Sequence, residues 1–268
     1  MVGMGPVFVS MLMLAVAAGG DKGPSAPAGM KLVPAGEFVM GCAPVTDRQC
    51  QVDEQPAHKA MIAAFFIDAA EVTVAEYKKC VEAGACAKPL NKDDNKNCNW
   101  GYGDRDAHPV NCVGWAHANA YCTWAGKRLP TEAEWEKASR GAAGAEYPWG
   151  ATKADCGLAV ISQGGEGCGK GMTWPVCSKA PGNSPFGLCD TVGNVWEWVA
   201  DWYAPDYYGK SPAADPAGPA TGVERVLKGG AWTSELAESV RSSVRLHFPP
   251  ATALGNFGFR CAQNVPAK

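Results

Sequence analysis

Three segments of the chain have the polar and apolar spacing of short helices. Thr73-Val-Ala-Glu76 and Thr131-Glu-Ala-Glu134 are capping boxes, in which a Thr hydroxyl and a Glu carboxylate satisfy free N–H groups of a first helical turn. The first predicted helix stops at Gly84, and the second runs to about residue 139. Between them, residues 113–125 are rich in alanine and predict a third helix. Its expected inner face carries Trp115, Tyr121 or Cys122, and Ala125.

The strand signals are short and are separated by turn-forming residues. Residues 30–40 alternate and contain Pro34-Ala-Gly36, which predicts a β-hairpin. Further strands are predicted at residues 61–67 and 225–229, and residues 205–222, rich in Pro, Ala and Gly, are predicted to form a surface loop. The pattern indicates an irregular α+β domain that is low in regular secondary structure.

Composition narrows this picture. The 268 residues include 32 Gly and 20 Pro. These residues interrupt helices, and so many of them exclude a helical bundle or a coiled coil. Disorder is excluded by 10 Trp, 8 Phe and 7 Tyr, which supply ample apolar area for a core. The net charge of -3 provides no excess of positive charge for a phosphate backbone, so nucleic acid is not expected as a partner.

The first twenty residues carry no charged side chain, and residues 7–18 are apolar except for Ser10. This stretch is too short to span a bilayer comfortably and ends in small residues, so residues 1–20 are predicted to be a signal peptide and residues 21–29 a flexible tether. An uncleaved membrane anchor or a misplaced start codon are the alternatives, because no Lys or Arg precedes the apolar run. The protein is therefore expected to be exported, to a periplasm, a cell surface or the medium, and to touch a membrane only through this segment.

The chain has 12 cysteines, all after this segment, and no C-x-x-C pair. An even count in an exported chain predicts structural disulfides rather than metal or redox sites. Six bridges allow about ten thousand pairings, and short sequence separations favour five of them. These pairs are Cys42 with Cys50, Cys80 with Cys86, Cys98 with Cys112, Cys156 with Cys168, and Cys177 with Cys189, which leaves Cys122 with Cys261.

Common catalytic motifs are missing or incomplete. The glycine-rich run at residues 164–173 approaches a phosphate-binding loop, but Gly171 stands where Ser or Thr should bind magnesium. There is no G-x-S-x-G elbow, and the 4 histidines lack metal-type spacing. Residues 190–198 are the strongest metal candidate, since Asp190 and Glu197 flank a flexible Gly193 and provide the hard oxygen ligands that calcium prefers. An aromatic core strand with Glu197 in a salt bridge explains the same segment equally well.

A series of motifs identifies a family resemblance. They are VPAGEFVMG at 33–41, EVTVAEY at 71–77, HPVNCVGW at 108–115, AYCTWAGKRLPTEAEWE at 120–136, YPWG at 147–150, GNVWEW at 193–198, KGGAW at 228–232 and GFRC at 258–261. In this order they strongly resemble the sulfatase-modifying factor family, which includes the formylglycine-generating enzymes. The resemblance covers residues 30–264 and implies a single domain with an irregular C-type-lectin-like fold stabilised by calcium.

The resemblance also implies roles for individual residues. Cys122 and Cys261 match a family disulfide, in agreement with the pair left over above. Trp196, Arg245 and Asn256 match positions that line the substrate groove.

The calcium hypothesis gains from the same resemblance. Asp190 and Glu197 match side-chain calcium ligands, and the carbonyl groups of Gly193 and Val195 match the remaining ligands.

A second family disulfide is missing. Its two positions fall at Ser139 and Ser242, and the loss of both is what physical pairing predicts, since one leftover thiol is a liability outside the cell.

The largest departure concerns copper. In the catalytic enzymes two cysteines after the K-G-G-S motif bind copper(I), a soft ion that suits thiolates. Ser234 and Ser239 stand at those positions here, and Ala231 replaces the serine of the motif. A hydroxyl neither holds copper(I) at neutral pH nor exchanges disulfides, so no copper-thiolate oxidase centre is expected.

Three functional hypotheses follow. The first is a domain that binds a peptide or another ligand, or assists protein maturation, with the scaffold, calcium site and groove retained. The second is an oxidase of the same family with a different centre; non-haem iron requires two His and a carboxylate, and His247 is the only His near the groove motifs. The third, a sugar-binding lectin, has little support, because no E-P-N or Q-P-D triplet occurs.

Overall fold

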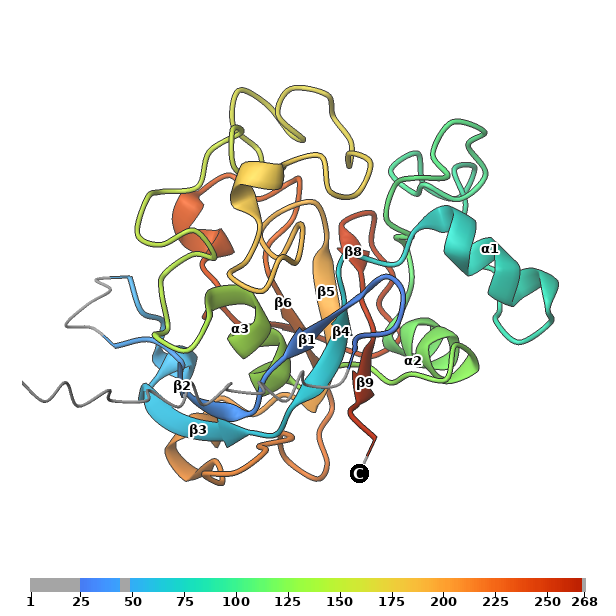
Figure 1. Ribbon diagram of the computed structural model, residues 1–268. Coiled ribbons are helices and arrows are strands. Elements are labelled where there is room, and N and C mark those ends of the chain that lie inside the picture. Colours follow the sequence, from blue (N-terminus) through green and yellow to red (C-terminus); the bar gives the residue numbers. More distant parts are fainter. Residues whose placement is uncertain (1–24, 44–48, 267–268) are drawn as a thin grey trace, which may run out of the picture.

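The computed structural model describes residues 25–43 and 49–266 (Figure 1). The predicted signal peptide and residues 21–24 of the predicted tether lie outside these residues. Within the described ranges, no helix has the length and apolar character needed to cross a membrane.

The described chain contains three α-helices and three small sheets. The helices are α1 (Val74–Glu82), α2 (Trp115–Trp124) and α3 (Glu132–Arg140). One sheet has the order β1 (Met30–Val33), β4 (Phe65–Asp68), β9 (Ala262–Asn264); a second pairs β2 (Gly36–Met40) with β3 (His58–Ile62). The third has the order β7 (Leu246–Phe248), β6 (Arg225–Lys228), β5 (Trp196–Trp202), β8 (Phe257–Gly258). Short 3-10 helices lie at Val52–Glu54, Ala180–Gly182, Tyr207–Lys210 and Ala237–Val240.

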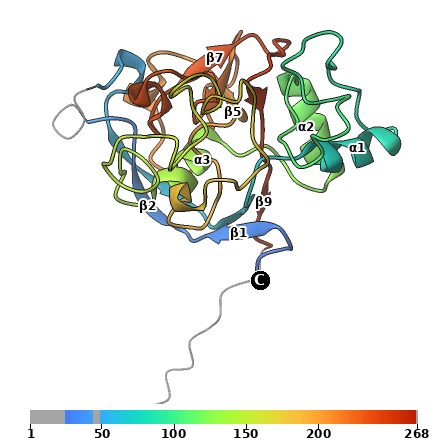
Figure 2. The same ribbon diagram turned by 90° about the horizontal axis from the view of Figure 1, so that it is seen from above.

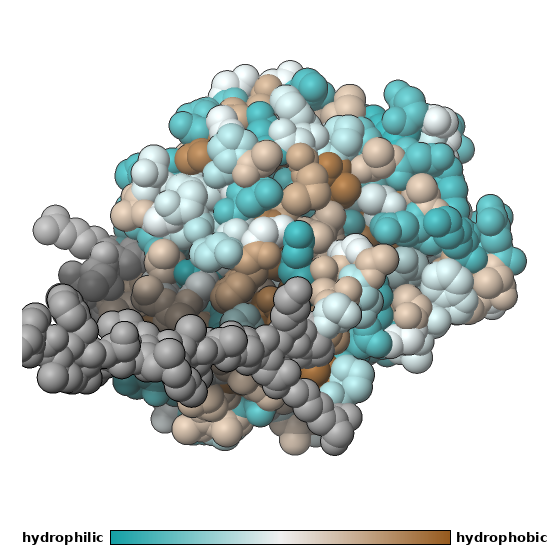
Figure 3. All heavy atoms as spheres, in the orientation of Figure 1, coloured by the Kyte–Doolittle hydropathy of each residue, from teal (hydrophilic) through white to brown (hydrophobic). Residues whose placement is uncertain are grey.

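The helices occupy different environments. Helices α1 and α2 lie together at one side of the molecule in both ribbon views, whereas α3 is central and contacts β2, β3, β5 and β6 (Figures 1 and 2). Hydrophilic side chains gather on the surface over α1 and the loops beside it, and polar and apolar residues are interspersed over the rest of this face (Figure 3). The small sheets and long loops confirm the predicted α+β architecture.

The capping boxes predicted at α1 and α3 are both formed. The Thr73 hydroxyl accepts a hydrogen bond from the Glu76 N–H (3.2 Å), and the Glu76 carboxylate accepts one from the Thr73 N–H (2.8 Å). Thr131 and Glu134 repeat this arrangement at α3. The third predicted helix is α2, which begins after Gly114 and ends at Trp124.

The hairpin predicted within residues 30–40 is wrong, because β1 and β2 do not pair with each other. They form one edge of a long antiparallel ribbon whose other edge is β3 and β4, with Val33 opposite Phe65 and Gly36 opposite Ile62. Pro34 lacks an N–H group for the ladder, so the chain bends between the two strands instead of reversing. The strand predicted at residues 61–67 is divided at the same bend into β3 and β4.

Helix α3 is buried along its whole length, although it carries five charged residues. A buried charge is tolerated only when it is paired, and each carboxylate of α3 meets a cation from elsewhere in the chain. The pairs are Glu132 with Arg245, Glu134 with Arg128, and Glu136 with both Lys228 and Arg140. The helix is therefore held in the core by ion pairs as well as by apolar packing.

The largest apolar cluster lies between α1, α2 and the sheet of β5 and β8. Trp198, Trp232, Phe257 and Phe259 are each no more than 1% exposed there. Side chains of this size contribute on the order of 2–3 kcal/mol each when they are fully buried.

Six disulfides staple these elements, and they are the pairs suggested by sequence separation together with Cys122–Cys261. Five of them close loops of 6 to 14 residues. Cys122–Cys261 spans 139 residues and ties α2 to the residue before β9. Residues 205–222 lie between its two cysteines, so this loop belongs to the same unit as the chain on both sides.

Ser139 and Ser242, which match the missing family disulfide, lie side by side. Their hydroxyl oxygens are 2.9 Å apart, and both residues are fully buried. A hydroxyl pair therefore occupies the place of a covalent link between α3 and the segment before β7.

We expect the double variant Ser139→Cys/Ser242→Cys to form a seventh disulfide. The native hydroxyl contact already places the two side chains together, and closing a loop of about 100 residues is worth up to about 4 kcal/mol through the unfolded state. Non-reducing peptide mapping should find the link, and Tm should rise. The variant Ser139→Cys alone is the matched control. Two free thiols in the folded double variant would contradict the assignment.

Candidate functional site

Three chain segments meet at the start of β5. The Trp196 N–H donates to the carbonyl of Asn256 (2.8 Å), and the Trp232 N–H donates to the carbonyl of Asn194 (2.9 Å). The Trp232 indole N–H donates to the Gly255 carbonyl (3.1 Å), which joins the second segment to the third. Residues 194–198, 228–234 and 255–261 are thus brought into one site.

Two of the three expected groove residues lie together in this site. Asn256 is half-buried next to Trp196, and its side-chain amide donates to the Thr233 hydroxyl (3.1 Å). Trp196 is 7% exposed, so most of its ring packs in the core.

Arg245, the third expected groove residue, forms a buried ion pair. Its guanidinium donates to both carboxylate oxygens of Glu132 (2.8 and 3.0 Å) and to the carbonyl of Asp53 (3.0 Å), and the aromatic rings of Tyr203 and Tyr208 flank it. Only 3% of Arg245 is exposed. Arg245 therefore supplies the positive charge that the buried Glu132 requires, and its groove role stays a prediction.

The three positions expected to differ from the copper enzymes are engaged in local hydrogen bonds. The Ser234 hydroxyl accepts from the N–H of Ala231 (3.1 Å) in a tight turn, and Ala231 is fully buried. Ser239 lies in the 3-10 helix at Ala237–Val240, where its hydroxyl donates to the Leu236 carbonyl (2.6 Å). Ser234 directly follows Thr233, whose hydroxyl accepts from Asn256, and Ser239 is part of a separate element.

A buried ion pair between Arg260 and Glu197 lies in the core next to the site. Arg260 donates from Nε and Nη2 to the two carboxylate oxygens of Glu197, both at 2.7 Å. The indole N–H of Trp135 in α3 donates to Glu197 as well (2.8 Å), and Arg260 also donates to the carbonyl of Cys189 (2.8 Å). Glu197 thus forms the salt bridge of the core-strand interpretation, and both of its oxygens have donors.

Two further buried carboxylates lie around this pair. Asp190 accepts from the Cys177 N–H (2.5 Å), and Glu71 accepts from the Asn194 side chain (2.7 Å) and the Val195 N–H (3.2 Å). Burial raises the pKa of Asp190 to about 6, and the neighbouring charge of Glu197 adds to the increase. Burial, followed by the charges of Asp190 and Glu197, raises the pKa of Glu71 well above its ordinary value.

The expected calcium ligands can be compared with this arrangement. Asp190, Glu197 and the carbonyls of Gly193 and Val195 are hard oxygen donors of the kind that calcium prefers, and Glu71 adds a third carboxylate near the single guanidinium of Arg260. Asp190 and Gly193 have φ angles of +53° and +82°, which curl the loop that carries them. Calcium would have to share Glu197 with Arg260 and Trp135.

The histidines are separate from one another. His247 Nδ1 lies 2.6 Å from a carboxylate oxygen of Glu224, and its ring stacks on Tyr203. His108 is buried against the Thr173 hydroxyl (2.9 Å), and burial lowers its pKa to about 4. Across the part of the chain that the structure describes, no group of three His, Cys, Asp or Glu side chains is arranged to hold a metal ion.

Glu71, Trp135 and Arg260 are site residues that spacing alone did not single out. Each lies within a motif that carries the family resemblance, but no sequence pattern shows that Glu71 reaches Asn194, 123 residues away. The available signal was a charged residue next to an apolar run, as in Phe-Gly-Phe-Arg260. When such a run is buried, the charged residue is buried with it and requires a partner of opposite charge.

Comparison with known proteins agrees with this geometry. The sequence model of a family described as "Sulfatase-modifying factor enzyme 1-like domain" matches residues 19–265. The formylglycine-generating enzyme of Streptomyces coelicolor is 35% identical over 93% of this chain and 95% of its own length. The hercynine oxygenase of Mycolicibacterium smegmatis is 33% identical over 75% of this chain and 53% of its own length.

A solved structure shares the architecture. That structure, of PvdO from Pseudomonas aeruginosa, superimposes with a TM-score of 0.75 and 27% identity, covering 88% of this chain and 94% of PvdO. The C-type-lectin-like α+β fold expected from the motifs is therefore confirmed.

The buried pair at the site gives a stability prediction. We expect Glu197→Ala to lower the free energy of unfolding by about 3–5 kcal/mol, because it leaves the Arg260 guanidinium buried without its counter-charge. Urea unfolding followed by Trp fluorescence measures the loss. Lys59→Ala removes an exposed ion pair with Glu37 and is the control, with little change expected. Equal losses in the two variants would contradict the structural role of the pair.

Calcium removal provides a second prediction. If Asp190 and its neighbours hold calcium, a chelator should lower Tm, because three buried carboxylates then face one guanidinium. Calcium should restore Tm in the wild type and have no effect on the Asp190→Asn variant. An identical wild-type Tm with calcium and with excess chelator would refute the calcium site.

Proposed function

Because the chain belongs to the sulfatase-modifying factor enzyme 1-like domain family, we propose that it is an exported binding or accessory protein-maturation domain without the copper-thiolate oxidase centre. Its ligand is a peptide, a protein or another molecule of the extracytoplasmic space. The scaffold of the family is retained, and the residues left for chemistry are hydroxyls, an amide and aromatic rings.

The observation that carries this proposal is the state of the sulfur atoms. All 12 cysteines lie within the described residues, and none is free. Copper(I) is held by soft thiolate ligands, and disulfide exchange begins with a thiolate. A chain whose cysteines are all paired has no thiolate for either task.

The hydroxyls at the equivalent positions support the same conclusion. Ser234 accepts a hydrogen bond in a turn, and Ser239 donates one to a carbonyl. Since a serine hydroxyl has a far higher pKa than a thiol, neither side chain ionises at neutral pH to replace a thiolate.

Two side chains support a retained binding role. Asn256 and Thr233, both half-buried beside Trp196, offer an amide and a hydroxyl to a ligand. We include a structural calcium ion, held by Asp190, Glu197 and the carbonyls of Gly193 and Val195, as part of the scaffold.

Export is supported by the disulfides together with the apolar residues 1–20. Six bridges indicate a compartment outside the reducing cytoplasm. The N-terminal segment has the length and small-residue ending of a signal peptide.

An oxidase with a different centre is the second candidate, and the similarity to a hercynine oxygenase favours it. Non-haem iron sites of the facial type require two His and a carboxylate. His247 has a carboxylate neighbour in Glu224, but His108 is engaged by Thr173. The binding role therefore ranks first.

The proposal predicts that the mature protein forms no formylglycine. The test incubates it with a C-x-P-x-R peptide, copper(I) and oxygen, and follows the aldehyde by mass spectrometry. The Streptomyces coelicolor enzyme provides the positive control. Ser234→Cys/Ser239→Cys should gain copper(I) binding where the wild type has none. Aldehyde formation by the wild type would refute the proposal.

A further inference from the structure

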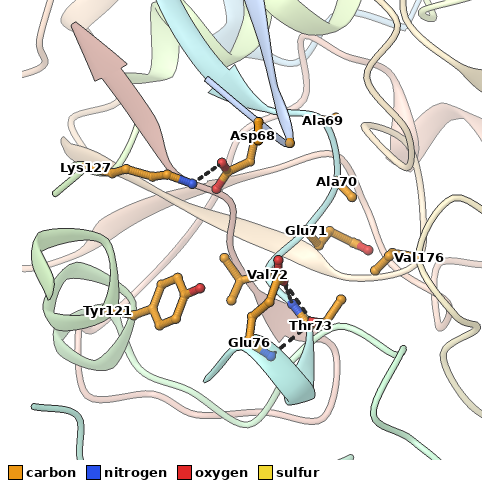
Figure 4. A pocket seen from close by; sticks show the side chains of 12 residues that line it. Asp68, Ala69, Ala70, Glu71, Val72, Thr73, Glu76, Tyr121, Lys127 and Val176 are labelled. Carbon is orange, nitrogen blue, oxygen red and sulfur yellow. Dashed lines mark hydrogen bonds and ion pairs between the residues drawn. The ribbon is translucent and has the colours of Figure 1, made fainter. Parts of the chain in front are cut away.

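A cavity of about 240 Å³ lies beside the candidate site, with which it shares Glu71, between the end of β4, the start of α1, and α2 (Figure 4). Its wall combines apolar groups with four charged side chains. The charged residues are Asp68, Glu71, Glu76 and Lys127. Three carboxylates and one ammonium give the wall an excess of negative charge.

Tyr121 provides an independent sign that the cavity receives a ligand. The residue is 7% exposed, and its ring is fixed by stacking on Tyr77 (5.6 Å between centroids) and by an edge contact with Phe259 (5.5 Å). Its hydroxyl points into the cavity and, among the described residues, has no hydrogen-bond partner (Figure 4). A ligand in the cavity can therefore bond this hydroxyl without breaking an internal hydrogen bond.

The carboxylates near this hydroxyl are those of Glu76 and Asp68. Burial raises the pKa of Tyr121, and the charges of Glu76 and Asp68 raise it further, so the phenol is neutral at pH 7 and its oxygen can accept a hydrogen bond. Asp68 already accepts from Lys127 (2.6 Å) and from the Cys261 N–H (3.0 Å). Glu76 uses one oxygen, Oε2, to cap α1.

We propose that this cavity binds a primary ammonium group on a short alkyl chain. The Tyr121 hydroxyl oxygen accepts one of its three hydrogen bonds, and Glu76 provides the counter-charge. The alkyl chain contacts Val72 and Val176, which line the same cavity. The site is separate from the proposed function and stands whether or not an oxidase activity is found.

Other ligand classes match the wall less well. An anion would face three carboxylates. A calcium ion takes six to eight oxygen ligands at about 2.3–2.6 Å, but Lys127 occupies one oxygen of Asp68, and Glu71 is engaged by Asn194 and Val195. An ammonium group requires few acceptors, and the charge of Lys127 in the same wall is already paired with Asp68.

The hydroxyl can be removed without breaking an internal hydrogen bond. We expect n-butylammonium to bind the mature protein, as followed by NMR shifts at constant ionic strength, and Tyr121→Phe to weaken binding about tenfold, the value of one charge-assisted hydrogen bond. Tm should not fall in Tyr121→Phe. Tyr102→Phe, whose hydroxyl donates to the Lys96 carbonyl elsewhere, is the control and should bind as the wild type does.

The charge is tested separately. Glu76→Gln keeps an acceptor for the helix cap and removes the negative charge, so it should weaken n-butylammonium binding, whereas Glu82→Gln, exposed at the other end of α1, should not. The peptide acetyl-Gly-Lys-Gly-amide distinguishes a lysine side chain from a free amine as the source of the ammonium. Equal binding of n-butanol, unchanged binding in Tyr121→Phe, or displacement of n-butylammonium by calcium would each overturn the proposal.

Discussion

The ion pair between Arg260 and Glu197 is the constraint on which the rest of the structure depends. One guanidinium, fully buried, joins the end of β4, Cys189 and β5, and through Glu197 it reaches Trp135 of α3. A charge at this depth is stable only with complete pairing. The loop of residues 190–195 and strand β5 are therefore fixed in position. Trp196, which begins β5, and its neighbour Asn256 are fixed with them.

Other residues at family motif positions are likewise engaged in internal contacts. Arg245 neutralises Glu132 in the core, Ser139 and Ser242 replace a covalent link by a hydroxyl contact, and all cysteines are joined in disulfides. Ser234 and Ser239 complete their local turns. The family scaffold is thus stabilised by residues that face inward.

Local features were predictable from the sequence, whereas most long-range contacts were not; the Cys122–Cys261 disulfide, left over after the short-range pairs, is an exception. The capping boxes at Thr73 and Thr131 depend on neighbours three residues apart, so the helices they start could be located. The hairpin failed because β1 pairs with a strand more than thirty residues later, which alternation within residues 30–40 cannot reveal. Trp196 and Asn256 were brought together as expected from the family motifs. Arg245 pairs with the buried Glu132, which a motif match could not show.

The central claim is that every cysteine of this chain is structural. Alkylation of the denatured, unreduced protein followed by mass spectrometry tests it most directly. The account predicts that no cysteine is alkylated before reduction and that all 12 are alkylated after it. A fixed pair of alkylated cysteines in the unreduced protein would contradict it, since two thiols would then be available for chemistry.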